Sequence, residues 1–171
     1  IKAIAYAEAM GLPRLADDSG LVVDALGGQP GVRSARYAGD AHRPGMPRSE
    51  RDRLNNERLL RELEGVPGED RSARFVCALC LALPGAEAAA EVRGEFEGRI
   101  GEPPAVPAGT NGFGYDPVFL VAPSFDRTSA ELTPEQKNAR SHRGEAVRAL
   151  AGRLRESPGL LARLDRSRAG A

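Results

Sequence analysis

The alternation of apolar and charged residues is clearest between residues 91 and 100. Small or apolar residues occupy every even position, and charged residues occupy every odd position. A period of two over this length predicts a strand with one solvated face. The preceding segment from Arg74 to Leu83 is continuously apolar and ends at the turn signal Pro84-Gly85, which predicts a buried antiparallel partner. Val118 to Val121 is a third apolar run, typical of a short buried strand.

Helical patterns flank these strands. Lys2 to Met10 is alanine-rich and ends at Gly11, and Arg48 to Glu64 is highly charged around a narrow leucine stripe. Thr133 followed by Pro134 is a helix-start signature, and Ser141 can cap a second helix running to about Arg155. We expect one further turn at 160–164 and a frayed tail at 165–171. The combination predicts an α/β fold with a partly antiparallel sheet.

Length and charge narrow the functional classes. A chain of 171 residues corresponds to a single domain, 1–171. Lys plus Arg equals Asp plus Glu at 24 each, so no overall field recruits nucleic acid or a membrane surface. No apolar run approaches the ~20 residues of a membrane span, and no signal peptide is visible. We therefore expect a cytoplasmic protein. Because the chain starts at Ile1, we also expect upstream residues in the natural protein.

The two cysteines form a C-x-x-C pattern, which occurs in zinc and redox sites. Cys77 and Cys80 lie inside the predicted buried strand, where residues three apart point to opposite faces. No second cysteine pair is present. We therefore interpret them as two small core side chains.

Adjacent carboxylates lie in the segment Leu15-Ala16-Asp17-Asp18-Ser19-Gly20-Leu21. One interpretation is a metal-binding or general-base carboxylate at the edge of a cleft, since Mg²⁺ usually takes one or two carboxylates together with substrate phosphates. The other is an Asp-Asp turn that caps a hairpin. The residues of this segment alone leave both interpretations open.

The segment Gly112-Phe113-Gly114-Tyr115-Asp116-Pro117 places an aromatic ring between two glycines. Such a ring can stack on a planar base. The alternative is that Phe113 and Tyr115 fill the core, which the residues alone favour because most aromatic side chains are buried. His142 and Arg143 fall in the first turn of a predicted helix, where positive charge opposes the helix dipole and indicates a ligand. Arg36 and Tyr37 are interpreted as pinning a loop.

Four motifs occur in a fixed order, and together they carry a resemblance. They are Ala16 to Leu21, Ser34-Ala35-Arg36-Tyr37, Gly112 to Pro117, and Glu135 to Asn138 followed by Ser141-His142-Arg143-Gly144. In this order they resemble the inosine triphosphate pyrophosphatase family, also called XTP/dITP diphosphatases. The likeness runs from Lys2 to about Leu154.

This resemblance implies a two-lobed α/β body around a long mixed, partly antiparallel sheet, with flanking helices and a central cleft. It implies a homodimer and a small-molecule substrate, a purine nucleoside triphosphate. The implied reaction is Mg²⁺-dependent hydrolysis of ITP, dITP and XTP to the monophosphate and pyrophosphate. Water attacks the α-phosphorus in that reaction, so charge neutralisation and water activation are the expected catalytic contributions.

The resemblance also implies residue roles. Asp18 would be the proton acceptor and a metal ligand, while Asp17 is given no fixed role. The substrate-binding residues would be Lys2, Ser19, Phe113, Gly114, Tyr115, Asp116, Lys137, His142 and Arg143. Lys2 would contact the triphosphate, although a surface lysine is the ordinary interpretation. Arg143 only donates hydrogen bonds, so it would donate to the O6 atom of a 6-oxo purine and disfavour adenine, whose amine at that position also donates.

One departure from the family motivates an alternative function. Family members open with a strand and a short phosphate loop containing Asn and Lys, which would precede Ile1. We therefore expect the 1–171 domain to lack both elements. The alternative is a non-catalytic nucleotide-binding remnant. The segment from His42 to Ser49 is also longer than is usual in the family.

Overall fold

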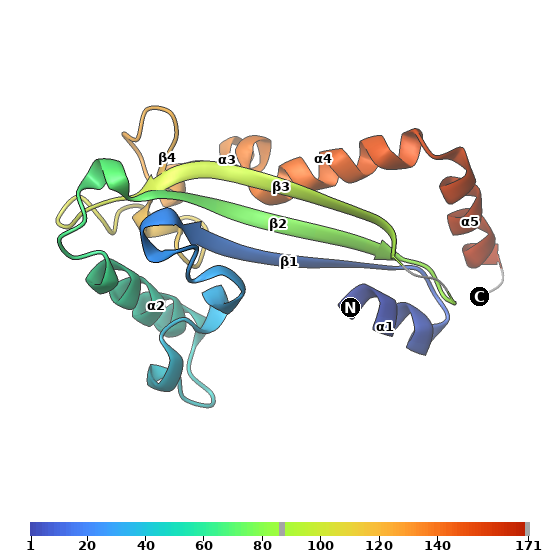
Figure 1. Cartoon of the computed structure of the whole chain (residues 1–171), viewed down its shortest axis with the longest axis horizontal. Helices are drawn as coiled ribbons and strands as arrows, with labels where there is room; N and C mark the ends of the chain where they lie inside the picture. Colours follow the sequence, from blue (N-terminus) through green and yellow to red (C-terminus); the bar gives the residue numbers. More distant parts are fainter. Residues whose placement is uncertain (86–87, 170–171) are drawn as a thin grey trace. The chain divides into compact units, whose positions relative to one another are not determined.

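A computed structural model describes residues 1–85 and 88–169 (Figure 1). Its sheet has the order β1-β2-β3-β4. The strands are β1 (Arg14–Val23), β2 (Ser72–Ala82), β3 (Ala88–Ile100) and β4 (Phe119–Val121). β3 and β4 pair antiparallel, with Gly98 opposite Val121. The α/β class and the antiparallel character predicted from the alternating residues are confirmed.

Five α-helices are described, together with short 3₁₀ turns in the connections. They are α1 (Lys2–Met10), α2 (Arg48–Glu62), α3 (Pro134–Arg140), α4 (His142–Arg155) and α5 (Pro158–Ala169). In the described part of the chain, no helix is both long and apolar enough to cross a bilayer.

The chain divides into two compact units, and the first three strands contribute residues to both. The first unit comprises Ile1–Asp18, Cys77–Glu95 and the chain from His142 onward. The second comprises Ser19–Val76 and Phe96–Ser141.

In the first unit, helices cover both faces of the sheet (Figure 1). α1 packs Ala3 and Ala7 against Ala82 of β2. On the other face, α4 packs Ala146 and Leu150 in a cluster with the β2 residues Cys77, Leu79 and Leu81. The strand alternation explains this division, since odd and even residues of β2 point to opposite faces.

The second unit is built around an aromatic core. The Phe119 ring lies 4.5 Å from the Phe75 ring and 5.4 Å from the Phe96 ring, centroid to centroid. Leu59 and Leu63, from the leucine stripe predicted for α2, are fully buried in the same cluster. This core anchors α2 beside the loop that precedes β4.

Several local predictions are confirmed. Gly11 adopts a left-handed conformation (φ 63°) at the end of α1, and Thr133 caps α3 with Pro134 in its first turn. Cys77 and Cys80 are not joined in a disulfide and lie on opposite faces of β2, each packed with a hydrophobic cluster, as the core interpretation required. Burial, as the first cause, raises the pKa of the Cys80 thiol.

Two local expectations differ from the structure. Of the two interpretations left open for the aspartate pair, the hairpin-capping turn is wrong, because Asp17 and Asp18 lie within the uninterrupted strand β1. The apolar residues that flank the two aspartates continue the strand, so the charged pair does not break it. The last turn expected at 160–164 is part of α5, which continues to Ala169, while the end of the expected tail, residues 170–171, lies outside the described residues.

Candidate functional site

Asp17 and Asp18 point to opposite faces of β1 in the first unit. Ala16 packs with the α1 cluster, and Asp18, two residues further on, lies 3.8 Å (Oδ1) from Lys2 Nζ of α1. Asp17 points the other way, with Oδ2 3.0 Å from Arg143 Nη2 of α4. The two carboxylates therefore serve different partners and do not form one paired-acid site.

A glycine on β3 allows the first turn of α4 to pack directly against the strand. A Cβ atom placed on Gly94 would lie 2.2 Å from the His142 carbonyl oxygen and 2.5 Å from the Ala146 nitrogen. Only glycine allows this close approach of helix and strand backbones. The Glu95 N–H also donates to Glu145 Oε2 at 2.7 Å. The first turn of α4, which carries His142 and Arg143, is thus fixed against β3.

The carboxylates of the first unit offer few ligands to a cation. Among the described residues, no group of three or more His, Cys, Asp or Glu side chains could hold a metal ion. Asp18 offers a single, exposed carboxylate beside Lys2. This donor set fits a Mg²⁺ ion held by one carboxylate and substrate phosphates, and it does not fit a cage made only of protein ligands.

In the second unit, the loop from Gly112 closes around Asp116. The Phe113 N–H donates to Asp116 Oδ2 at 2.7 Å, and Lys137 of α3 donates to the same oxygen. Asp116 is almost completely buried. Gly112 has φ 77°, and a Cβ there would lie 2.1 Å from that oxygen, so this loop position also requires glycine.

The loop presents Phe113 and buries Tyr115. Phe113 remains 45% exposed, with Arg48 Cζ 4.2 Å and Lys137 Nζ 5.3 Å from its ring centroid. The expectation that this ring fills the core is wrong. The same expectation is correct for Tyr115. This side chain is 4% exposed, and its hydroxyl donates a hydrogen bond to the Ser34 carbonyl at 2.8 Å. Burial raises the pKa of Tyr115 far above the ordinary tyrosine value.

Three α2 residues contact this loop and were not singled out from the sequence, which showed only that the 48–64 segment is highly charged around a leucine stripe. Asp52 Oδ2 accepts the Gly114 N–H at 2.9 Å, and Asn56 Nδ2 donates to the Gly114 carbonyl at 3.0 Å. Arg48, Asp52 and Asn56 follow one another at intervals of four residues, which places all three on one face of the helix. That spacing is the signal that could have identified them. A hollow of about 740 Å³ lies between this face and the loop.

Ser19 and Tyr37 belong to the second unit. Ser19 is half-buried in β1. Tyr37 is buried, and its hydroxyl donates to Glu62 of α2, so its predicted role of pinning a loop is confirmed. Burial first, and then the hydrogen bond with Glu62, raise the pKa of Tyr37 to about 12.

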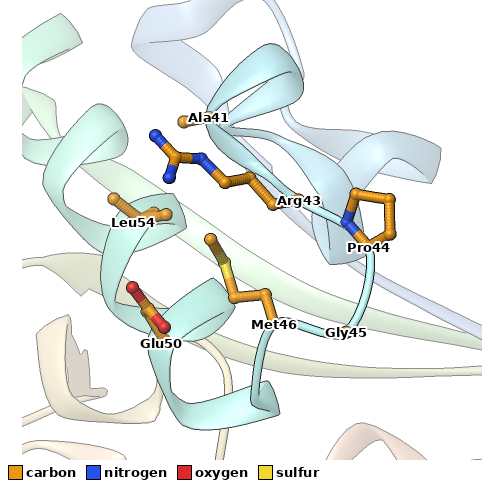
Figure 2. Close-up of a pocket in the computed structure, with 7 residues that line it drawn as sticks. All are labelled: Ala41, Arg43, Pro44, Gly45, Met46, Glu50 and Leu54. Atoms are coloured by element: carbon orange, nitrogen blue, oxygen red, sulfur yellow. The ribbon is translucent and has the colours of Figure 1, made fainter.

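A second hollow, of about 530 Å³, lies between the loop at 41–46 and α2 (Figure 2). Figure 2 shows Arg43 and Met46 extending from the loop toward Leu54 and Glu50 of the helix. None of the site residues predicted from the sequence lines it. It is formed by the segment that the sequence marked as unusually long.

The predicted residues are therefore divided between the two units. The first unit pairs Lys2 with Asp18 and Arg143 with Asp17, and it places His142 beside Arg143. The second unit brings together Phe113, Gly114, Asp116 and Lys137, with Tyr115 beneath them in the core.

Several known proteins are similar to this chain in sequence and in fold. Two curated relatives are named dITP/XTP pyrophosphatase. The one from Bacillus licheniformis is 52% identical over 154 residues, covering 90% of this chain and 72% of its own. The one from Frankia alni is 53% identical over 156 residues, covering 91% and 73%. Among solved structures, the Staphylococcus aureus Ham1 protein has a TM-score of 0.77 at 40% identity, covering 91% of this chain and 73% of its own.

The four motifs thus belong to a likeness that extends over most of the chain, from α1 through α4. The Ham1 family model matches residues 1–153, which include β1 with its two aspartates, the Phe113 loop and the first turn of α4. Both the sequence and the fold place the chain in the same group of proteins: it belongs to the Ham1 family.

Proposed function

We propose that this protein hydrolyses non-standard purine nucleoside triphosphates, namely ITP, dITP and XTP, to the monophosphate and pyrophosphate. The names of the curated relatives, about half identical to this chain, support the substrate class. The observation that carries the proposal is the loop that holds the Phe113 ring half-exposed between two cationic side chains. An exposed ring in a fixed loop is suited to stack on a planar base.

Each unit contributes residues to which the family resemblance gives a role in base binding: Phe113 and Lys137 in the second unit, and His142 and Arg143 in the first. Phe113 provides the stacking surface, and the Asp116–Lys137 pair holds the loop beneath it. Arg143 donates to the O6 atom of hypoxanthine or xanthine, where adenine carries an amine that also donates. Asp17 keeps the Arg143 guanidinium oriented through its ion pair.

The proposed phosphate chemistry uses Asp18, Lys2 and Ser19. Asp18 accepts a proton from the attacking water, whose oxygen bonds to the α-phosphorus while the bond to the bridging oxygen breaks and pyrophosphate leaves. Lys2 offsets the negative charge of the phosphates, and Ser19 donates a hydrogen bond to the substrate. Mg²⁺, when bound by Asp18 and the phosphates, would neutralise charge that develops on the phosphate oxygens.

The proposal extends to assembly and location. We propose a homodimer, as the family resemblance implies, and a cytoplasmic location, where nucleoside triphosphates are used. The exposed apolar residues Tyr6, Met10 and Leu15 of the first unit supply surface of the kind that subunits bury. Sedimentation of the purified protein measures the oligomeric state directly.

The reaction test uses the purified protein with ITP, dITP, XTP, ATP and GTP, with Mg²⁺ and with a chelator. The expected products are monophosphate and pyrophosphate in equal amounts, formed from the first three substrates and only with the metal. Diphosphate and inorganic phosphate would place attack at the γ-phosphorus and contradict the proposal. Saturable ITP binding without turnover would favour the non-catalytic remnant.

A further inference from the structure

The Phe113 loop is attached to α2 through both peptide groups of one residue. Gly114 donates its N–H to Asp52 Oδ2 at 2.9 Å and accepts at its carbonyl from Asn56 Nδ2 at 3.0 Å. Asp52 and Asn56 are one helical turn apart, so their side chains leave the helix on the same face. Gly114 itself has φ 64°, a left-handed conformation that glycine adopts without strain.

The backbone on the N-terminal side of Phe113 is held by a hydrogen bond as well. Its own N–H donates to the buried Asp116, which also binds Lys137. The peptide groups before and after the Phe113 side chain are therefore both hydrogen-bonded, while the ring remains exposed. This is the arrangement expected of a preformed contact surface, because little conformational freedom is then lost when a ligand binds.

Asp52 also links the backbone to the cation above the ring. Its Oδ2 atom, which accepts from Gly114, lies 3.7 Å from Arg48 Nε. The Arg48 guanidinium in turn lies 4.2 Å from the Phe113 ring centroid. One carboxylate thus contacts both the loop that carries the partly exposed ring and the arginine side chain that lies beside it.

We propose that Asp52 and Asn56 are positioning residues that set the orientation of the Phe113 ring for stacking on the substrate base. The inference rests on the proposed function and adds two residues that act on the base through Phe113. Neither side chain takes part in the proposed chemistry at phosphorus. Their loss should therefore weaken substrate binding and leave the chemical step largely unchanged.

The kinetic test compares Asp52→Ala, Asn56→Ala and Asp52→Asn, with Arg51→Ala as the control from an exposed position of the same helix. Each alanine variant should raise the KM for ITP about five- to tenfold, with kcat within about twofold of wild type. Asp52→Asn retains an oxygen that accepts from Gly114 and should recover most of the affinity. A fall in kcat at unchanged KM, or an Asp52→Asn variant as impaired as Asp52→Ala, would overturn the proposal.

A second measurement does not depend on catalysis. The chain contains no tryptophan, so Phe113→Trp introduces a single indole at the ring position. Adding Asp52→Ala to this variant should increase acrylamide quenching of the indole about twofold, whereas adding Asp52→Asn should not. Equal quenching in all three proteins would overturn the positioning role. If wild type fails to cleave ITP, the proposed function fails, and the quenching data still decide whether α2 orders the loop.

Discussion

Arg143 and Asp17 form an ion pair in which Nη2 and Oδ2 are 3.0 Å apart. Asp17 is the aspartate for which the family resemblance gave no role, and Arg143 is the residue expected to recognise the base. The pair joins the start of α4 to β1 within the first unit. Asp17 therefore contacts a guanidinium of α4, whereas Asp18 faces Lys2 of α1.

Arg143→Ala should reduce kcat/KM for ITP and XTP about ten- to hundredfold, because a hydrogen bond from a charged donor contributes roughly 1.5–3 kcal/mol. Any rate on ATP should fall much less, since adenine offers no acceptor at that position. Asp17→Asn should also lower the preference for ITP and XTP over ATP, by a smaller factor. Both side chains are nearly half exposed, so thermal stability should change little. Equal losses on ITP and ATP would show that Arg143 is structural.

Asp18→Asn should reduce kcat for ITP by about a hundredfold or more, the usual contribution of a general base. Binding of IMP, measured by calorimetry, should stay within about threefold of wild type because the base-binding groups are unchanged. Asp40→Asn, at an exposed aspartate outside the predicted site, is the matched control. The Asp18 assignment fails if the variant turns over ITP at a near-normal rate with Mg²⁺ present.

Gly94→Ala should destabilise the protein by about 1–3 kcal/mol, because the added methyl group meets backbone atoms of α4 that cannot rotate away. Gly152→Ala is the control within α4. A Cβ at that position meets no atom within 4 Å, so alanine should be neutral or stabilise the helix by up to about 1 kcal/mol. Urea unfolding of the two variants measures both effects. A Gly94→Ala protein as stable as wild type would contradict the proposed close packing.

Tyr37 should make stability fall at high pH. Its pKa is about 12 in the folded protein, above the ordinary value of 10.0, so the native state holds the proton more tightly than the unfolded chain. The stabilisation is fully present below about pH 10 and is lost as the pH rises toward about 12. Tyr37→Phe should therefore flatten the decline in that window by at most about 1.4 kcal/mol per pH unit. The raised pKa of Tyr115 also makes stability fall at high pH. Part of the decline should therefore remain in the Tyr37→Phe variant.

Unfolding free energies of wild type and Tyr37→Phe, measured by urea titration at about pH 9 and about pH 11, test this linkage. The difference between the two proteins should shrink as the pH rises. A constant difference would mean that the Tyr37 hydroxyl titrates alike in the folded and unfolded states. Tyr6, which is exposed, provides the control Tyr6→Phe.

Features encoded by neighbouring residues could be predicted from the sequence. The alternation in residues 91–100 identified β3 because a strand repeats every two residues. Gly11 marked the end of α1, and Thr133 with Pro134 marked the start of α3. The ordered motifs identified the family, since each is a short run of particular residues that remains recognisable without any knowledge of its partners.

Contacts between residues that are distant in the sequence became known only from the tertiary structure. Local residues left a turn at Asp17 and Asp18 as one of two interpretations, but the strand continues through them and sends their side chains to opposite faces. Whether Phe113 or Tyr115 is buried depends on the core beneath the loop. Asp52 contacts Gly114 from 62 residues away, which the charge pattern of α2 does not encode. Propensities and motifs act within a few residues, whereas exposure and hydrogen-bond partners are set by the packing of whole elements.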